Sequence, residues 1–147
     1  SECLVGSEMC IRDRIDTIRN MHISHIAIWT TRLEELRNFY ITYFNGTSNE
    51  KYINPKKGFE SYFISFDQGF ASLEIMQRQD ITTPALKDCL GLAHFSFSVG
   101  SKEAVLELTE QLRKDGFVIE SEPRTTGDGY FESAILDPEG NIVEITI

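Results

Sequence analysis

Residues 92–99, read as "LAHFSFSV", alternate between apolar and polar side chains with a period of two. This pattern predicts a β-strand with one buried face and one exposed or functional face. Phe95 and Phe97 fall on the buried face of such a strand, whereas His94 and Ser96 fall on the other. A histidine on the polar face of one strand says little by itself, so its meaning depends on whether the rest of the chain repeats it.

The element order of residues 21–80 recurs in residues 91–147, and each half is predicted to be a βαβββ module. A short strand is followed by one amphipathic helix and then by further short strands in both halves. The sequence predicts helices over 33–44 and 102–114, and strands over 22–29, 52–53, 61–66, 71–77, 92–99, 118–120, 130–136 and 142–147.

Local signals mark where the predicted helices begin and end. Thr31 and Glu34 have the spacing of a capping box at the start of the first helix. Gly46 and Gly116 each follow a helix, 70 positions apart, and are predicted to take the left-handed conformation after a helix end. Residues 137–140, "DPEG", predict a tight turn that delivers the last strand as a hairpin arm.

Two histidines and two glutamates occupy corresponding positions in the two modules. His25 and His94 lie in the first strand of each module, 69 positions apart, and Glu74 and Glu144 lie in the last strand of each, 70 positions apart. Because these offsets agree with the glycine offset to one residue, the four side chains are predicted to be equivalent by repetition. This repetition favours a site over four unrelated surface residues.

Strand parity places each of the four side chains on the face opposite the helix. If the modules form a curved, cup-like mixed sheet with the helices outside, the four side chains are expected to meet in the hollow. Two imidazoles and two carboxylates, without thiolates, suit one divalent ion such as nickel, zinc, cobalt, manganese or iron. The predicted metal ligands are His25, Glu74, His94 and Glu144. The fold class is predicted to be α+β.

Composition narrows the partners that the chain can have. The formal net charge is −9 and the pI is near 4.8, which argues against nucleic acid or an anionic membrane and favours a small-molecule substrate. No apolar run is long enough for a membrane span, and the absence of a signal segment favours the cytoplasm. Cys3, Cys10 and Cys89 form no C-x-x-C pair. Residues 1–20 lack a clear period and are expected to be a non-native or disordered leader before a single domain over 21–147.

Four segments carry a family resemblance: "HIAIWTTRLEELRNFYITYFNG", "ASLEIM", "LAHFSFSV" and "DPEGNIVEI". With them, residues 21–147 resemble the vicinal oxygen chelate superfamily, which includes glyoxalase I, bleomycin-resistance proteins, fosfomycin-resistance enzymes, methylmalonyl-CoA epimerase and extradiol dioxygenases. The resemblance implies paired βαβββ modules, a homodimer, and a metal that chelates two neighbouring substrate oxygens.

The order histidine, glutamate, histidine, glutamate resembles the ligand pattern of glyoxalase I, or lactoylglutathione lyase. It implies a lyase or isomerase that acts on a hemithioacetal or related hydroxy-carbonyl through a metal-stabilised enediolate, as in methylglyoxal detoxification. Glu144 and Glu74 are then expected to carry the proton. Two alternatives stay open: an iron-dependent extradiol-type dioxygenase, and a non-catalytic protein that binds a small molecule or antibiotic.

Three further residues are expected to contact substrate. Trp29 stands where a bacterial glyoxalase I typically has an arginine for the glutathione carboxylate, and Arg78 stands where an asparagine is expected. An indole cannot hold a carboxylate as a guanidinium does, so these positions leave the identity of a low-molecular-weight thiol cosubstrate open. Arg78, and Arg124 in the predicted loop "RTTGDGY", are the cations that could supply charge from other directions.

Overall fold

The computed structural model describes residues 22–67, 69 and 71–147. The predicted leader, residues 1–20, lies outside this range. The first module contains β1 (His25–Trp29), α2 (Leu33–Phe44), β2 (Thr47–Ser48), β3 (Tyr52–Asn54), β4 (Phe59–Ser65) and β5 (Ser72–Arg78). The second contains β6 (Phe95–Ser98), α3 (Lys102–Lys114), β7 (Ile119–Thr125), β8 (Phe131–Leu136) and β9 (Ile142–Thr146).

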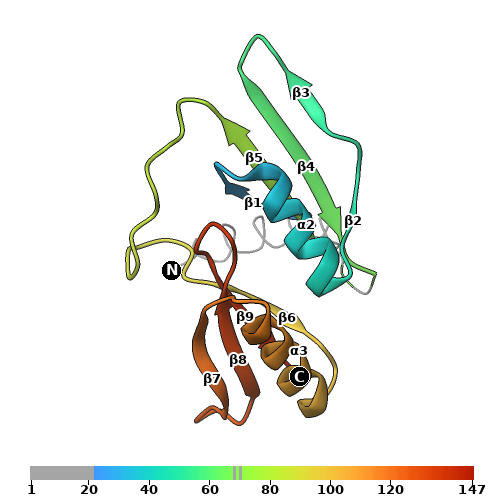
Figure 1. The fold of residues 1–147 in the computed structure, drawn as a ribbon, viewed down its shortest axis with the longest axis vertical. Coiled ribbons are helices and arrows are strands. Elements are labelled where there is room, and N and C mark those ends of the chain that lie inside the picture. The colour runs from blue at the N-terminus through green and yellow to red at the C-terminus, as the bar shows by residue number, and fades with distance from the viewer. Residues whose placement is uncertain (1–21, 68, 70) are drawn as a thin grey trace, which may run out of the picture.

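Each module has its own mixed sheet, which confirms the predicted α+β class (Figure 1), and the first module has one short strand more than the predicted βαβββ order, because β2 and β3 both pair with β4. The first sheet has the order β1-β5-β4-β2, with β3 also paired to β4, and the second has the order β6-β9-β8-β7. The first strand of each module runs parallel to the last one, and the remaining pairs are antiparallel. The two modules therefore share one topology, as the sequence repeat predicts.

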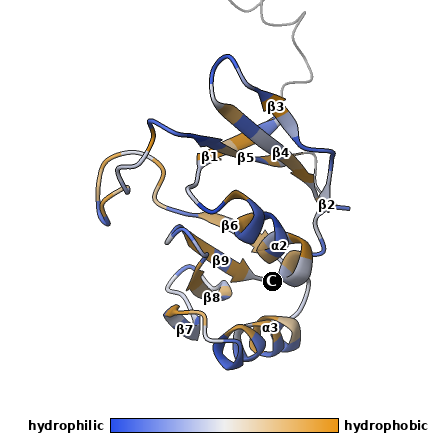
Figure 2. Cartoon of the chain, turned by 45° about the horizontal axis from the view of Figure 1, so that its top comes forward, coloured by the Kyte–Doolittle hydropathy of each residue, from blue (hydrophilic) through white to orange (hydrophobic). Residues whose placement is uncertain are grey.

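Helix α2 packs against both modules. Its residue Leu36 is completely buried in the core beside Ile64 and Ile75 of the first sheet. On the other side its aromatic rings meet β6, where the centroids of Phe44 and Phe97 are 4.4 Å apart. Figure 2 shows α2 lying between the first sheet and β6. One continuous hydrophobic core thus joins the two modules through this helix.

Polar contacts fasten the turn between β8 and β9 to the segment between β1 and α2. The buried Tyr40 hydroxyl donates to Asp137 Oδ2 at 2.7 Å. The hydroxyl of Thr30 and the backbone N–H of Thr31 both donate to Glu139 Oε2, at 2.5 and 2.9 Å. We call these five residues the intermodule clasp. Burial, and then the charge of Asp137, raises the pKa of Tyr40 well above its usual value.

The predicted capping box does not form. The residue that precedes α2 is Arg32, which makes no side-chain cap, and its own N–H donates to Thr30 Oγ1 at 2.8 Å. Thr31 contacts Glu139 of the second module instead, and Glu34 accepts from the Tyr62 hydroxyl at 2.9 Å. Tertiary partners have therefore replaced the local pairing that the spacing suggests.

The end of α2 also differs from the prediction. Asn45, with a φ of 53°, takes the left-handed position that was expected for Gly46. Gly46 is needed for space, because a Cβ there would lie 2.5 Å from Ile64 Cγ2. Gly116 after α3 has a φ of 89°, and Gly140 in the β8–β9 turn has a φ of 91°, as predicted. No helix within the described residues is long and apolar enough to cross a membrane.

Candidate functional site

His25 and Glu74 lie together on the face of the first sheet that points away from α2. Glu74 sits between the buried Leu73 and Ile75, so its own side chain projects to the opposite face. His25 Nε2 is 3.7 Å from Glu74 Oε2, and the two side chains are 44% and 15% exposed. The strand parity that the sequence predicts is confirmed for this first His–Glu pair.

His94 and Glu144 form a second His–Glu pair on the second sheet. Val143 and Ile145, on either side of Glu144, are completely buried. His94 Nε2 is 3.2 Å from Glu144 Oε2, with side-chain exposures of 46% and 20%. Both glutamates are thus held on rigid strands with their carboxylates turned toward a half-exposed imidazole.

Strand register makes the two pairs equivalent. In the first sheet Glu74 lies opposite Ala27 of β1, two residues after His25. In the second sheet Glu144 lies opposite Ser96 of β6, two residues after His94. Each histidine therefore reaches its glutamate along the same diagonal of a parallel strand pair. Both modules therefore place one histidine and one glutamate in the same relative positions.

The two His–Glu pairs lie on different sheets. Among residues 22–147 that are described, no group of three or more His, Cys, Asp or Glu side chains is arranged to hold a metal ion. The structure describes two His–Glu pairs, one on each sheet, and a site that combines all four side chains stays a prediction. The two modules share one hydrophobic core, to which α2 contributes residues that also contact β6.

The donor chemistry of each pair fits a divalent metal ion. Imidazole nitrogen and carboxylate oxygen, half-exposed on a strand, are ligand types that zinc, nickel, cobalt, manganese and iron accept. One pair offers one histidine and one glutamate, which is fewer than the three or four protein ligands of a typical catalytic site. A metal site with three or four protein ligands would therefore have to draw on both pairs.

Trp29 and Arg78 come together near the first pair. Trp29 shares the sheet face of His25 and is 39% exposed. The Arg78 guanidinium lies over the Trp29 ring, 5.3 Å from its centroid, and also bonds Asp80 at 2.5 Å. That hydrogen bond lowers the pKa of the Asp80 carboxyl. Arg78 is therefore a side chain whose charge already has a partner.

Arg124 is not in a loop, as the sequence suggested, but in strand β7. Its register partner is Glu132 of β8, which in turn lies opposite Thr146 of β9. Glu144 is two residues before Thr146, so Arg124 belongs to the sheet face that carries the second pair. The structure does not bring it to Trp29 and Arg78.

Sequence reasoning missed three aromatic residues of the first sheet. Phe63 lies opposite Glu74, and its ring meets the His25 ring edge-on at 5.4 Å. Phe59 and Tyr52 continue on the same face. The alternation in "FESYFIS" of β4 is the signal that could have revealed them, since Phe59 and Phe63 share one parity.

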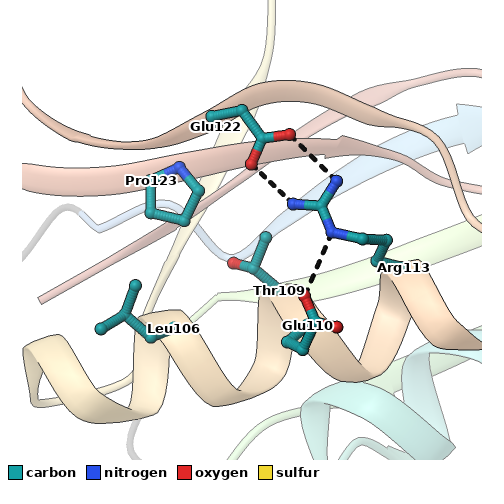
Figure 3. A pocket seen from close by; sticks show the side chains of 6 residues that line it. All are labelled: Leu106, Thr109, Glu110, Arg113, Glu122 and Pro123. Atoms are coloured by element: carbon teal, nitrogen blue, oxygen red, sulfur yellow. Dashed lines mark hydrogen bonds and ion pairs between the residues drawn. The ribbon is translucent and has the colours of Figure 1, made fainter.

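An open hollow between α3 and β7 contains none of the predicted site residues (Figure 3). Arg113 forms a forked ion pair with Glu122 there, at 2.9 and 2.6 Å, and donates to Glu110 at 3.1 Å. Because two carboxylates already satisfy this guanidinium, the hollow has no charge to offer an anionic ligand. The His–Glu pairs remain the candidate site.

Comparison with known proteins identifies the family of this fold. Residues 22–145 match the family model of the glyoxalase/bleomycin resistance protein/dioxygenase superfamily. A search of curated proteins found no match.

Several solved structures share the fold at low sequence identity. The trypanothione-dependent glyoxalase I of Leishmania major has a TM-score of 0.69 at 20% identity, over 86% of this chain and 86% of that one. A glyoxalase/bleomycin resistance protein/dioxygenase domain from Frankia sp. EAN1pec has a TM-score of 0.75 at 18% identity, over 87% and 98%. Glyoxalase I from Zea mays has a TM-score of 0.72 at 19% identity, over 85% of this chain but 44% of that one.

Proposed function

Because the chain belongs to the glyoxalase/bleomycin resistance protein/dioxygenase superfamily, we propose that it is a metal-dependent lyase or isomerase of the glyoxalase I type. The single observation that carries this proposal is the presence of two equivalent His–Glu pairs. The proposed substrate is a hemithioacetal or a related hydroxy-carbonyl compound, and the corresponding role is methylglyoxal detoxification in the cytoplasm.

The proposed ligands are His25, Glu74, His94 and Glu144. A bound divalent ion would polarise two adjacent substrate oxygens and so acidify the proton on the neighbouring carbon. Nickel, zinc, cobalt, manganese and iron are all compatible with two imidazoles and two carboxylates.

Glu144 is the proposed proton carrier. Its buried neighbours fix the strand, and its carboxylate is 20% exposed, so a substrate on this face can reach it. In the proposed reaction a Glu144 oxygen accepts the proton from one carbon of the substrate and returns it to the next carbon. Glu74, 15% exposed, holds the equivalent place in the first module and is the second candidate for this role.

A homodimer is the proposed way to complete the site. Each chain carries one pair of each kind, and the pairs stand apart within the described part of the chain. A second copy related by a two-fold axis can place its second pair opposite the first pair of its partner. This arrangement gives two identical sites per dimer, each with ligands from both chains.

Mixing two defective variants tests the shared site. His25→Ala with Glu74→Gln removes the first pair, and His94→Ala with Glu144→Gln removes the second. Each homodimer should bind almost no metal, whereas co-expressed chains should recover about a quarter of the wild-type metal content, because half of the random dimers carry one intact site. The measurement is elemental analysis after gel filtration. No recovery in verified mixed dimers would contradict a shared site.

A methylglyoxal assay with several low-molecular-weight thiols tests the reaction. Turnover should require both the metal and one of the thiols. The exposed aromatic rings beside the first pair favour one rival, a non-catalytic protein that binds small molecules on this face. A purified protein that contains no metal and shows no turnover would favour that rival, and oxygen uptake with a catechol would favour a dioxygenase.

A further inference from the structure

A row of aromatic side chains crosses the face of the first sheet that points away from α2. Its members, which we call the aromatic row, are Trp29, Tyr52, Phe59 and Phe63. The strand register places all four on this face, in the three strands β1, β3 and β4. Glu74 and Arg78 of β5 lie between β1 and β4 on the same face. Trp29 is 39%, Tyr52 53% and Phe63 37% exposed. Such exposure of neighbouring large rings marks a binding surface more often than a structural one.

Ring contacts join three members of the row, edge-on between Trp29 and Phe59 and tilted between Phe59 and Tyr52. Phe59 lies 6.1 Å from Trp29 with the ring planes at 90°, and 6.1 Å from Tyr52 at 60°. The Arg78 guanidinium lies over the indole ring of Trp29. Edge contacts of this kind hold the rings in place while ring surface stays accessible, which suits a flat ligand with a π-system of its own.

The row extends from the first His–Glu pair to the far end of the sheet. Phe63 is directly opposite Glu74, whereas Trp29 is four residues beyond His25 along β1. At about 3.3 Å per residue, Trp29 is therefore about 13 Å from His25 along the strand. A molecule whose oxygens lie at the pair can reach Trp29 and Phe59 only with an extended tail.

The charges around Trp29 indicate which chemical group the far end of such a molecule can carry. The chain has a net charge of −9, and the cation beside Trp29 is Arg78, which already bonds Asp80. A carboxylate arriving here would have to displace Asp80 from Arg78. A neutral flat group pays no such cost and gains contact with the rings.

We propose that Trp29, Phe59 and Tyr52 form a subsite for a neutral, planar aromatic group at the end of the substrate or cosubstrate remote from the His–Glu pair. The position of the other end of this molecule rests on the proposed function. The subsite itself does not require metal, because none of its three residues is a proposed ligand.

Trp29 is the single tryptophan of the chain, so its fluorescence reports on this subsite alone. The experiment titrates the full chain, as purified, with benzamide and separately with cyclohexanecarboxamide, exciting above the absorption of either amide. The two probes share the amide and differ in whether the ring is flat. Benzamide should change the Trp29 emission with a Kd about 2- to 10-fold lower than that of cyclohexanecarboxamide.

Two variants locate the binding. Phe59→Ala and Tyr52→Ala should each abolish this preference for the flat ring and keep the fold, which circular dichroism checks. Tyr130→Ala is the matched control, since Tyr130 is a 59% exposed aromatic residue of the second module, and it should leave both constants unchanged. Equal constants for the two probes in the wild type, or a preference that survives in both variants, would overturn the proposal.

Probe binding at the subsite can be tested independently of metal binding, on which the proposed function depends. His94→Ala should lose metal and still prefer benzamide, so metal loss in this variant does not affect the subsite. If neither probe binds the wild-type chain, the proposal is wrong, whether or not Phe59→Ala changes the sedimentation mass.

Discussion

Glu144 gives the sharpest prediction for a single residue. Glu144→Gln keeps the shape of the side chain and one oxygen that can ligate, but removes the base. Metal content should fall only modestly, while turnover falls by about 10² or more, the range for loss of a general base. The same variant should stop exchanging the carbon-bound proton of the substrate with deuterated water, which NMR measures.

The matching variant of the first module decides how the two glutamates divide their roles. If Glu144→Gln turns over at the wild-type rate and Glu74→Gln is inactive, the proton carrier is Glu74. If both variants remain fully active, proton transfer by either glutamate is wrong.

The two histidines are expected to matter for metal binding and not for folding. His25→Ala and His94→Ala should each reduce metal content sharply, because each removes one of the four proposed ligands. Both side chains are almost half exposed and leave the core untouched, so the melting temperature of the metal-free protein should stay within a few degrees of wild type. His22→Ala is the control, since His22 precedes β1. Wild-type metal content in both variants would refute the assignment.

For single residues, the sequence predicted correctly which face of a sheet a side chain occupies, but it predicted less well which element a residue belongs to. Alternation alone placed His25 and Glu144 on the faces where the structure has them. Arg124 was assigned to a loop because "TTGDG" follows it, yet hydrogen bonding to β8 extends the strand to Thr125. The end of β7 depends on its pairing with β8, which is distant in sequence, so the local sequence pattern cannot show where this strand ends.

Among the secondary-structure elements, the segment before α2 shows how a partner distant in sequence overrides a local rule. Thr31 and Glu34 have the spacing of a capping box, but Glu139 of the second module takes the donors that the box would use. Glu139→Ala should therefore lower the free energy of unfolding by about 1–3 kcal/mol, because it leaves the Thr30 and Thr31 donors without this acceptor.

Glu107→Ala on α3 is the matched control for that variant. It also removes one negative charge, from an exposed position on the helix, and should change stability by about 0.5 kcal/mol or less. Urea denaturation compares the two. Equal midpoints would mean that the clasp contributes nothing to stability.

A second contact between elements predicts a pH dependence. Tyr43 of α2 donates to Asp115 after α3 at 2.7 Å, and this hydrogen bond raises the pKa of Tyr43 to about 12. The unfolded value is about 10, so the folded protein holds this proton more tightly than the unfolded chain. The contribution is fully present below pH 10 and is lost as the pH rises through 12. Denaturation midpoints between pH 9 and pH 12 should fall less steeply in Tyr43→Phe than in the wild type.

For the whole molecule, the repeat predicted two modules but not how they pack. The sequence predicts that the helices lie outside the sheets, and α3 fits this prediction with its buried residues Val105 and Leu112. In α2 the buried side includes Phe39 and Tyr40, which also contact Phe117 and Phe95 of the second module. Binary patterning counts apolar positions but does not show which sheet each one contacts, so the packing of α2 against both modules could not be predicted from the sequence.

Because α2 packs on two sides, the two modules cannot be exchanged for each other. Two identical modules would be interchangeable, but here one helix has become a shared part and the other has not. An exchange of the α2 and α3 sequences would leave Phe97 and Phe117 without the rings that cover them. The first module therefore supplies the helix that joins the two sheets, and the second module supplies no equivalent helix, although each module carries a His–Glu pair.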